Sequence, residues 1–91
     1  MIKTKKSTIP KSIKTMVWNN YIGSAIAETL CMCCKQEKIN IRHFHCGHII
    51  PESNGGTLEL ENLRPICAPC NSSMGNRNMR EFVKTFFNRE I

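Results

Sequence analysis

Two pairs of cysteines stand at a spacing that binds metal. Cys31 and Cys34 have two residues between them, as do Cys67 and Cys70, and residues 35–66 separate the two pairs. Each such turn lets two thiolates face one ion, and two turns together complete a tetrahedral site with four sulfur ligands. We therefore expect one structural Zn²⁺ bound by these four residues, with no open position for water.

Two further cysteines leave alternatives open. Cys33 lies inside the first pair and could replace either neighbour as a ligand, whereas Cys46 has no partner at this spacing. The competing interpretation is that the cysteines are buried free thiols or disulfides. No apolar segment typical of a secretory signal follows the basic N-terminus, so we expect a cytoplasmic protein. In that reducing compartment clustered cysteines bind metal more often than they form disulfides.

Length and composition predict one small domain. The chain has 91 residues, of which 41% are hydrophobic. A domain of this size has a small core and commonly needs a staple such as a metal ion. No run of about 18 apolar residues occurs, so no membrane helix is expected. We expect a flexible basic arm over residues 1–9 and a single domain over 10–91, with its core at about 31–80.

The basic charge points to DNA. The chain has 13 Lys and Arg against seven acidic residues, a net charge of +6. The candidate phosphate contacts lie in the arm and toward the C-terminus, and they are Lys3, Lys5, Lys6, Arg64, Arg77 and Arg80. The three arginines could equally be plain surface charges. Few aromatic residues stand near basic ones, so stacking on bases is only weakly indicated.

Local patterns predict the elements that must position these residues. We expect helices at 10–22, 24–30, 68–75 and 79–87, and two strands, 37–45 and 44–50, paired with each other. Turn residues occupy 52–56, a loop follows at 57–62, and 63–66 is extended. The last helix should place Met79, Phe82, Val83 and Phe86 on one face. The expected core residues are Phe44, Ile49, Ile50, Leu63, Ile66, Met74, Met79 and Phe82.

The central segment resembles a known family. The stretches that carry the likeness are Gly-His-Ile-Ile-Pro at 47–51, Gly-Gly at 55–56, Glu-Asn-Leu-Arg-Pro-Ile-Cys at 61–67, Cys-Asn at 70–71 and Met-Gly at 74–75. In order and spacing they resemble an HNH endonuclease of the ββα-metal superfamily, in its form with a four-cysteine zinc site. Residues 17–23 are also similar to the lead-in of small HNH proteins of phages and large DNA viruses. The resemblance implies an α+β fold with a ββα-metal core and flanking helices.

The resemblance also implies roles for three residues. His48 matches the general base, and an imidazole titrates near neutral pH, as that task requires. Asn62 matches the middle residue of the motif, which fixes the loop and helps to orient the histidine. Asn71 matches the residue that begins the helix and faces a catalytic cation, Mg²⁺ or Mn²⁺. Taken singly, the three would more often be a core histidine, a turn residue and a helix cap.

The sequence departs from the family at one position. Many members have Asp directly before the base histidine as a second metal ligand, whereas Gly47 stands here and the chain has no Asp at all. His45 lies two residues earlier on the same face of a strand, about 6.6 Å away. It is therefore a candidate ligand, and the alternative is an ordinary surface histidine. If an ion lies on this face, an Asp at position 47 should lower the metal concentration that cleavage needs.

These observations predict a metal-dependent endonuclease that hydrolyses phosphodiester bonds in DNA, most simply double-stranded DNA. One active site cuts one strand, so either a monomer or a homodimer is compatible. The first alternative is a zinc-stapled DNA-binding module that does not cleave, and the second is a purely structural interaction domain.

Overall fold

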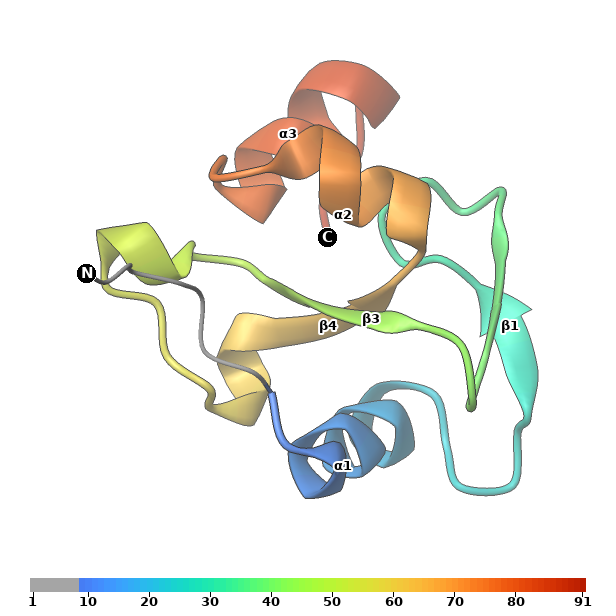
Figure 1. Cartoon of the computed structure of the whole chain (residues 1–91). Coiled ribbons are helices and arrows are strands. Elements are labelled where there is room, and N and C mark those ends of the chain that lie inside the picture. The colour runs from blue at the N-terminus through green and yellow to red at the C-terminus, as the bar shows by residue number, and fades with distance from the viewer. Residues whose placement is uncertain (1–8) are drawn as a thin grey trace.

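The computed structural model describes residues 9–91. Lys3, Lys5 and Lys6 of the predicted arm lie outside the described residues. A hairpin of two strands, β3 (His45–His48) and β4 (Leu63–Ile66), crosses the centre of the molecule, with one helix on one face and two on the other (Figure 1). A second, smaller hairpin of β1 (Glu28–Leu30) and β2 (Lys38–Asn40) lies at one end of it. This mixed arrangement of helices and small antiparallel sheets agrees with the predicted α+β class.

Helix α1, Lys11–Tyr21, agrees closely with the helix predicted at 10–22. It follows Pro10, whose carbonyl accepts hydrogen bonds from the amides of the first turn. Its apolar face buries Val17 and Trp18. The indole Nε1 of Trp18 donates to the carbonyl of Ile26 at 2.8 Å, which ties the following turn to the helix.

The predictions for residues 24–50 were wrong in two respects. Residues 24–30 form no helix, because Glu28–Leu30 is strand β1 and pairs antiparallel with β2, Lys38–Asn40. The strand expected at 37–45 is therefore shorter, and its partner is not the segment 44–50. The physical reason is the turn around Cys31 and Cys34, which reverses the chain and makes residues 28–30 the nearest neighbours of residues 38–40.

The central hairpin consists of two segments that were correctly predicted to be extended but were not predicted to pair with each other. Strand β3, His45–His48, pairs antiparallel with β4, Leu63–Ile66, so that His45 lies opposite Ile66 and His48 opposite Leu63. The connection contains two short 3-10 helices, η1 at Glu52–Asn54 and η2 at Leu60–Asn62. Strand β4 packs against α1, and β3 packs against α2.

Helices α2, Ala68–Met74, and α3, Met79–Phe87, confirm both C-terminal predictions. Each begins with a side-chain cap. The sulfur of Cys67 accepts a hydrogen bond from the amide of Cys70, and Oδ1 of Asn78 accepts from the amides of Arg80 and Glu81. Such caps satisfy amides at a helix start that have no partner within the helix.

The core lies between the hairpin and its covering helices. Most predicted core residues are buried there, including Leu63, Ile66 and Met79. One of these predictions was wrong: Ile50, which comes after β3 has ended, is 43% exposed. Phe86, which shares a predicted helix face with Met79, Phe82 and Val83 and lies on the last turn of α3, is 56% exposed. Within residues 9–91, no helix is long and apolar enough to cross a membrane.

Candidate functional site

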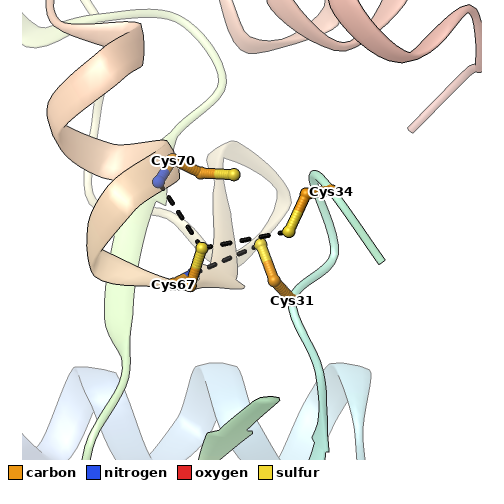
Figure 2. Close-up of side chains that lie close together, drawn as sticks. All are labelled: Cys31, Cys34, Cys67 and Cys70. Carbon is orange, nitrogen blue, oxygen red and sulfur yellow. Dashed lines mark hydrogen bonds between the residues drawn. The ribbon is translucent and has the colours of Figure 1, made fainter. Parts of the chain in front are cut away.

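The four predicted zinc ligands converge in space. The sulfurs of Cys31, Cys34, Cys67 and Cys70 all lie within 4.8 Å of one another, and those of Cys34 and Cys67 are 4.0 Å apart. Figure 2 shows the four side chains pointing toward a common centre, two from the β1–β2 connection and two from the start of α2. Four sulfurs bound at about 2.3 Å to a tetrahedral ion are about 3.8 Å apart, so this donor set fits zinc.

Backbone amides also point at these sulfurs. Sγ of Cys31 accepts from the amides of Cys33 and Cys67, each at 3.2 Å, and Sγ of Cys34 accepts from the amide of Glu37 at 3.4 Å. Lys35 adopts a left-handed conformation, with φ of 59°, to close the first turn. Amide donors favour thiolate over thiol, because hydrogen bonds to the charged form stabilise it.

The two remaining cysteines are not members of this group. Cys33 is fully buried beside the cluster, and Cys46 is buried on β3. The alternatives that exchanged Cys33 for Cys31 or Cys34 are therefore not the arrangement found. All six cysteines are free thiols, so the disulfide interpretation is not supported.

Hydrogen bonding and burial shift the pKa values of the cluster's thiols in opposite directions. Hydrogen bonding with the Cys33 side chain lowers the pKa of the Cys31 thiol to about 4. Burial raises the pKa of Cys67 to about 11 and raises that of Cys70 as well. Crowded thiolates repel one another, and a bound dication offsets that repulsion while displacing the thiol protons.

Asn62 closes the connection between the two central strands. Its side chain accepts from the amide of Ile50 at 2.9 Å and donates to the carbonyls of Thr57 at 2.9 Å and Ile50 at 3.2 Å. It is buried, with 9% of its surface exposed. Close packing requires Gly56 here, because a Cβ would lie 1.7 Å from the carbonyl oxygen of Ile50. Asn62 thus fixes the chain immediately after His48.

His45 and Asn71 lie together at the surface. Nδ1 of His45 is 3.5 Å from Nδ2 of Asn71, and this contact links β3 to α2. Asn71 follows Cys70 directly, so the cysteine cluster determines where its amide points. Two ligands of one octahedral Mg²⁺ at about 2.1 Å are about 3.0 Å apart. If the Asn71 amide turned over to bring Oδ1 to the present place of Nδ2, a small movement would let both side chains bind the same ion. The set is weak, since both donors are neutral.

The position before His48 is filled by other side chains. A Cβ on Gly47 would lie 2.5 Å from Cδ1 of Ile66 and 2.7 Å from the terminal methyl of Met79. Real Cβ atoms do not approach other atoms so closely. An acid at position 47 therefore does not fit unless Ile66 and Met79 move, which corrects the expectation that Asp there would simply restore a ligand.

His48 lies at the C-terminal end of β3, three residues beyond His45. The residue is half-buried, and its Nε2 atom is buried. A base at this position must therefore turn its ring, or use its other nitrogen, to meet a water molecule. The strand places His48 next to the loop that Asn62 fixes, and the amide of Ile49 donates to the carbonyl of Asn62 at 2.8 Å.

The three arginines have different surroundings. Arg64 lies 4.3 Å above the ring of Tyr21 and donates to its hydroxyl at 2.7 Å, while that hydroxyl donates to the carbonyl of Leu60 at 2.7 Å. This contact joins α1 to the connection before β4, which gives Arg64 a structural task that sequence reasoning missed. Arg77 and Arg80 are exposed beside and on α3.

The fold and the cysteine cluster together define a small ββα domain with four cysteines placed to bind a metal ion. The model of a family described as HNH endonuclease matches residues 31–87. The chain therefore belongs to the HNH endonuclease family, as the motifs at 47–51, 61–67 and 70–71 indicated. No curated protein and no solved structure matches the chain.

Proposed function

We propose that this protein is a metal-dependent endonuclease that hydrolyses phosphodiester bonds in DNA. The observation that carries the proposal is the contact between His45 and Asn71 at 3.5 Å, on the strand that ends in His48. The contact supports a cation site here, because imidazole and amide side chains can both bind metal and Asn71 matches the residue that faces the cation in the family. The net charge of +6 adds attraction for the phosphate backbone.

The residues have separate tasks in this proposal. His48 is the general base and takes a proton from the attacking water, while Asn62 holds the adjoining loop so that the ring stays in place. Asn71, with His45 beside it, holds Mg²⁺ or Mn²⁺, which when bound supplies positive charge to the phosphate and to the departing 3′ oxygen. Arg77, Arg80 and the lysines of the arm contact phosphates. The family resemblance implies products with 5′-phosphate ends.

A second candidate function also has an observation in its favour. The side chains of Ile66 and Met79 fill the space that an acid at position 47 would need, and Nε2 of His48 is buried. Both features suit a zinc-stapled module that binds DNA without cutting it. Such a module would show DNA affinity that depends on salt but no dependence of product formation on added cation.

Nicking of supercoiled plasmid separates the two functions. The zinc-loaded protein is incubated with and without added Mg²⁺ or Mn²⁺, and chelators are avoided because they would also remove zinc. We expect His48→Ala to slow nicking by about 100- to 10,000-fold and His43→Ala, the matched change at an exposed histidine, to leave it unchanged. Wild-type rates from His48→Ala would refute the mechanism. Tight DNA binding without nicking in any cation would favour the module that does not cleave.

A further inference from the structure

Phe86 is an exposed aromatic side chain on a firm support. It is 56% exposed, the largest exposed fraction among the large hydrophobic residues of the described chain. Its ring centre lies 5.2 Å from that of Phe82, which is buried in the core. The outer part of the Phe86 ring is therefore open to solvent, while its inner part rests on a fixed neighbour.

Arg77 is held against the same ring. Its guanidinium carbon lies 5.4 Å from the ring centre of Phe86 and 5.9 Å from that of Phe82. Its backbone amide donates to the carbonyl of Met74 at 3.0 Å, which fixes the connection between α2 and α3. The planar guanidinium of Arg77 and the ring of Phe86 thus lie together at the surface. Both side chains are already partly ordered before any ligand binds, which lowers the entropy cost of binding.

The charge around this pair suits a polyanion. Residues 77–90 contain four cations against two acids, Glu81 and Glu90. Lys84 pairs with Glu90 at 3.5 Å and Arg89 donates to the carbonyl of Cys33, so Arg77 and Arg80 stand against Glu81 alone. A second copy of this chain is a poorer occupant, because the same face on two molecules would bring Arg77 and Arg80 close to their own counterparts.

The pair is also connected to the candidate nuclease site. The amide of Met79, at the start of α3, donates to the carbonyl of Ile49 at 2.9 Å, directly after His48. Phe86 lies seven positions after Met79 on the helix, a rise of about 10 Å. A nucleic acid strand at His48 therefore runs close to the Phe86–Arg77 pair if it follows α3.

We propose that Phe86 and Arg77 form a stacking platform for an unpaired nucleobase, so that the preferred substrate carries a single-stranded segment beside the cut. Aromatic rings and guanidinium planes both stack on bases, and this stacking tolerates every base because each has a flat face. This inference rests on the proposed action on DNA and names the form of DNA that would be preferred.

A fluorescent reporter tests the platform directly. In Phe86→Trp the new indole is exposed, whereas the native Trp18 is fully buried and gives a constant background. We expect a single-stranded oligonucleotide of about ten nucleotides to quench the emission, because that length covers a typical single-stranded site. A blunt hairpin duplex of equal charge should quench it little. The matched control is Ile41→Trp, at a position 41% exposed, whose emission should not change.

Affinity measurements with Phe86→Leu complete the test. The substitution keeps an apolar side chain but removes the ring, and we expect about tenfold weaker binding of the single strand with less than twofold change for the duplex. Arg77→Lys keeps the positive charge but loses the planar guanidinium group. It should also weaken binding of the single strand. Zinc content and thermal unfolding of each variant show whether the fold is intact.

The outcomes distinguish this inference from the proposed function. Equal quenching of Phe86→Trp and Ile41→Trp, or unchanged single-strand affinity in a folded Phe86→Leu, would overturn the platform even if plasmid nicking continues. Quenching by the single strand without nicking in any cation would support the platform and refute the nuclease. A dimer in sedimentation that Phe86→Leu abolishes would identify a second copy as the occupant and overturn the platform.

Discussion

Nδ1 of His45 lies 3.5 Å from the side-chain amide of Asn71, although 26 positions separate the two residues in the chain. The contact joins the strand that carries the candidate base to the helix that begins at the cysteine cluster. The sequence left two interpretations of His45 open, a metal ligand or a surface histidine. In the fold His45 lies next to Asn71, the residue that the family motif assigns to the metal.

This contact predicts a metal requirement that depends on both side chains. We expect His45→Ala to raise by about tenfold or more the Mn²⁺ concentration that gives half-maximal nicking, and Asn71→Ala to raise it further. Asn71→Asp should lower it, because a carboxylate binds a hard cation more strongly than an amide does. Rates measured over a series of Mn²⁺ concentrations check this, with His43→Ala as control. An unchanged requirement in His45→Ala would make His45 a surface residue.

The packing over Gly47 predicts a loss of stability. We expect Gly47→Ala to lower the free energy of unfolding by about 1–3 kcal/mol, because its new methyl group meets Ile66 and Met79. Gly47→Asp should cost more, since its carboxylate would also be buried. Urea unfolding of zinc-loaded protein measures both.

A double variant identifies the cause of that loss. The loss of unfolding free energy in the double variant Gly47→Asp, Met79→Ala should be smaller than the sum of the losses in the two single variants, because the shorter side chain leaves room for the acid. A Gly47→Ala protein as stable as wild type would show that the two covering side chains move aside freely.

The cysteine cluster predicts which thiols hold the zinc. Cys34→Ser and Cys67→Ser should lose the metal and unfold, because apparent zinc binding energies of about 10 kcal/mol or more exceed what so small a core supplies. Cys33→Ser and Cys46→Ser, the matched changes at buried thiols outside the cluster, should keep one zinc per chain. Elemental analysis of untagged protein with far-ultraviolet circular dichroism gives the answer. Loss of zinc from Cys33→Ser alone would reassign the first pair.

The basic arm predicts how DNA affinity depends on salt. Each phosphate contact contributes about 0.9 to the slope of log affinity against log salt concentration, so replacing Lys3, Lys5 and Lys6 by Ala should reduce the slope by up to about 2.7. Binding to a short duplex at several salt concentrations measures this. Replacing Lys11, Lys38 and Arg42, which are exposed and lie outside the proposed DNA contacts, by Ala gives a control with the same change in net charge. Equal slopes for the wild type and the arm variant would exclude the arm from the interface.

Local sequence patterns correctly predicted three helices, because the start and end of a helix depend mainly on nearby residues. The helices at Lys11–Tyr21, Ala68–Met74 and Met79–Phe87 have periodic apolar faces, a cap or a proline at the start, and a defined end. The spacing of the cysteines predicted the cluster of Cys31, Cys34, Cys67 and Cys70, because two short turns are enough to specify four converging thiols. The turn at 52–56 was likewise evident from its glycines.

The pairing of strands could not be predicted in the same way. Strand β1 contains only Glu28–Leu30, too short for any period, and its partner is chosen by the turn around the first cysteine pair. The contact of Met79 with Gly47 depends on how α3 lies over the hairpin, a tertiary arrangement that leaves no pattern in either segment. The exposure of Phe86 could not be predicted either, since its spacing along the helix matches that of the buried residues Phe82 and Val83.

The hydrogen bonds of the Asn62 side chain determine where residues can be inserted into this domain. Because it bonds to Ile50 on one side and Thr57 on the other, the connection between β3 and β4 is closed near its base, and Glu52–Asn54 forms an exposed tip beyond that closure. Closing a longer loop costs only about 0.6 kcal/mol for each doubling of its length. Residues inserted at this tip would therefore leave the strand register, His48 and the metal cluster in place. The tip is the point at which the domain can gain a new recognition segment without rebuilding its centre.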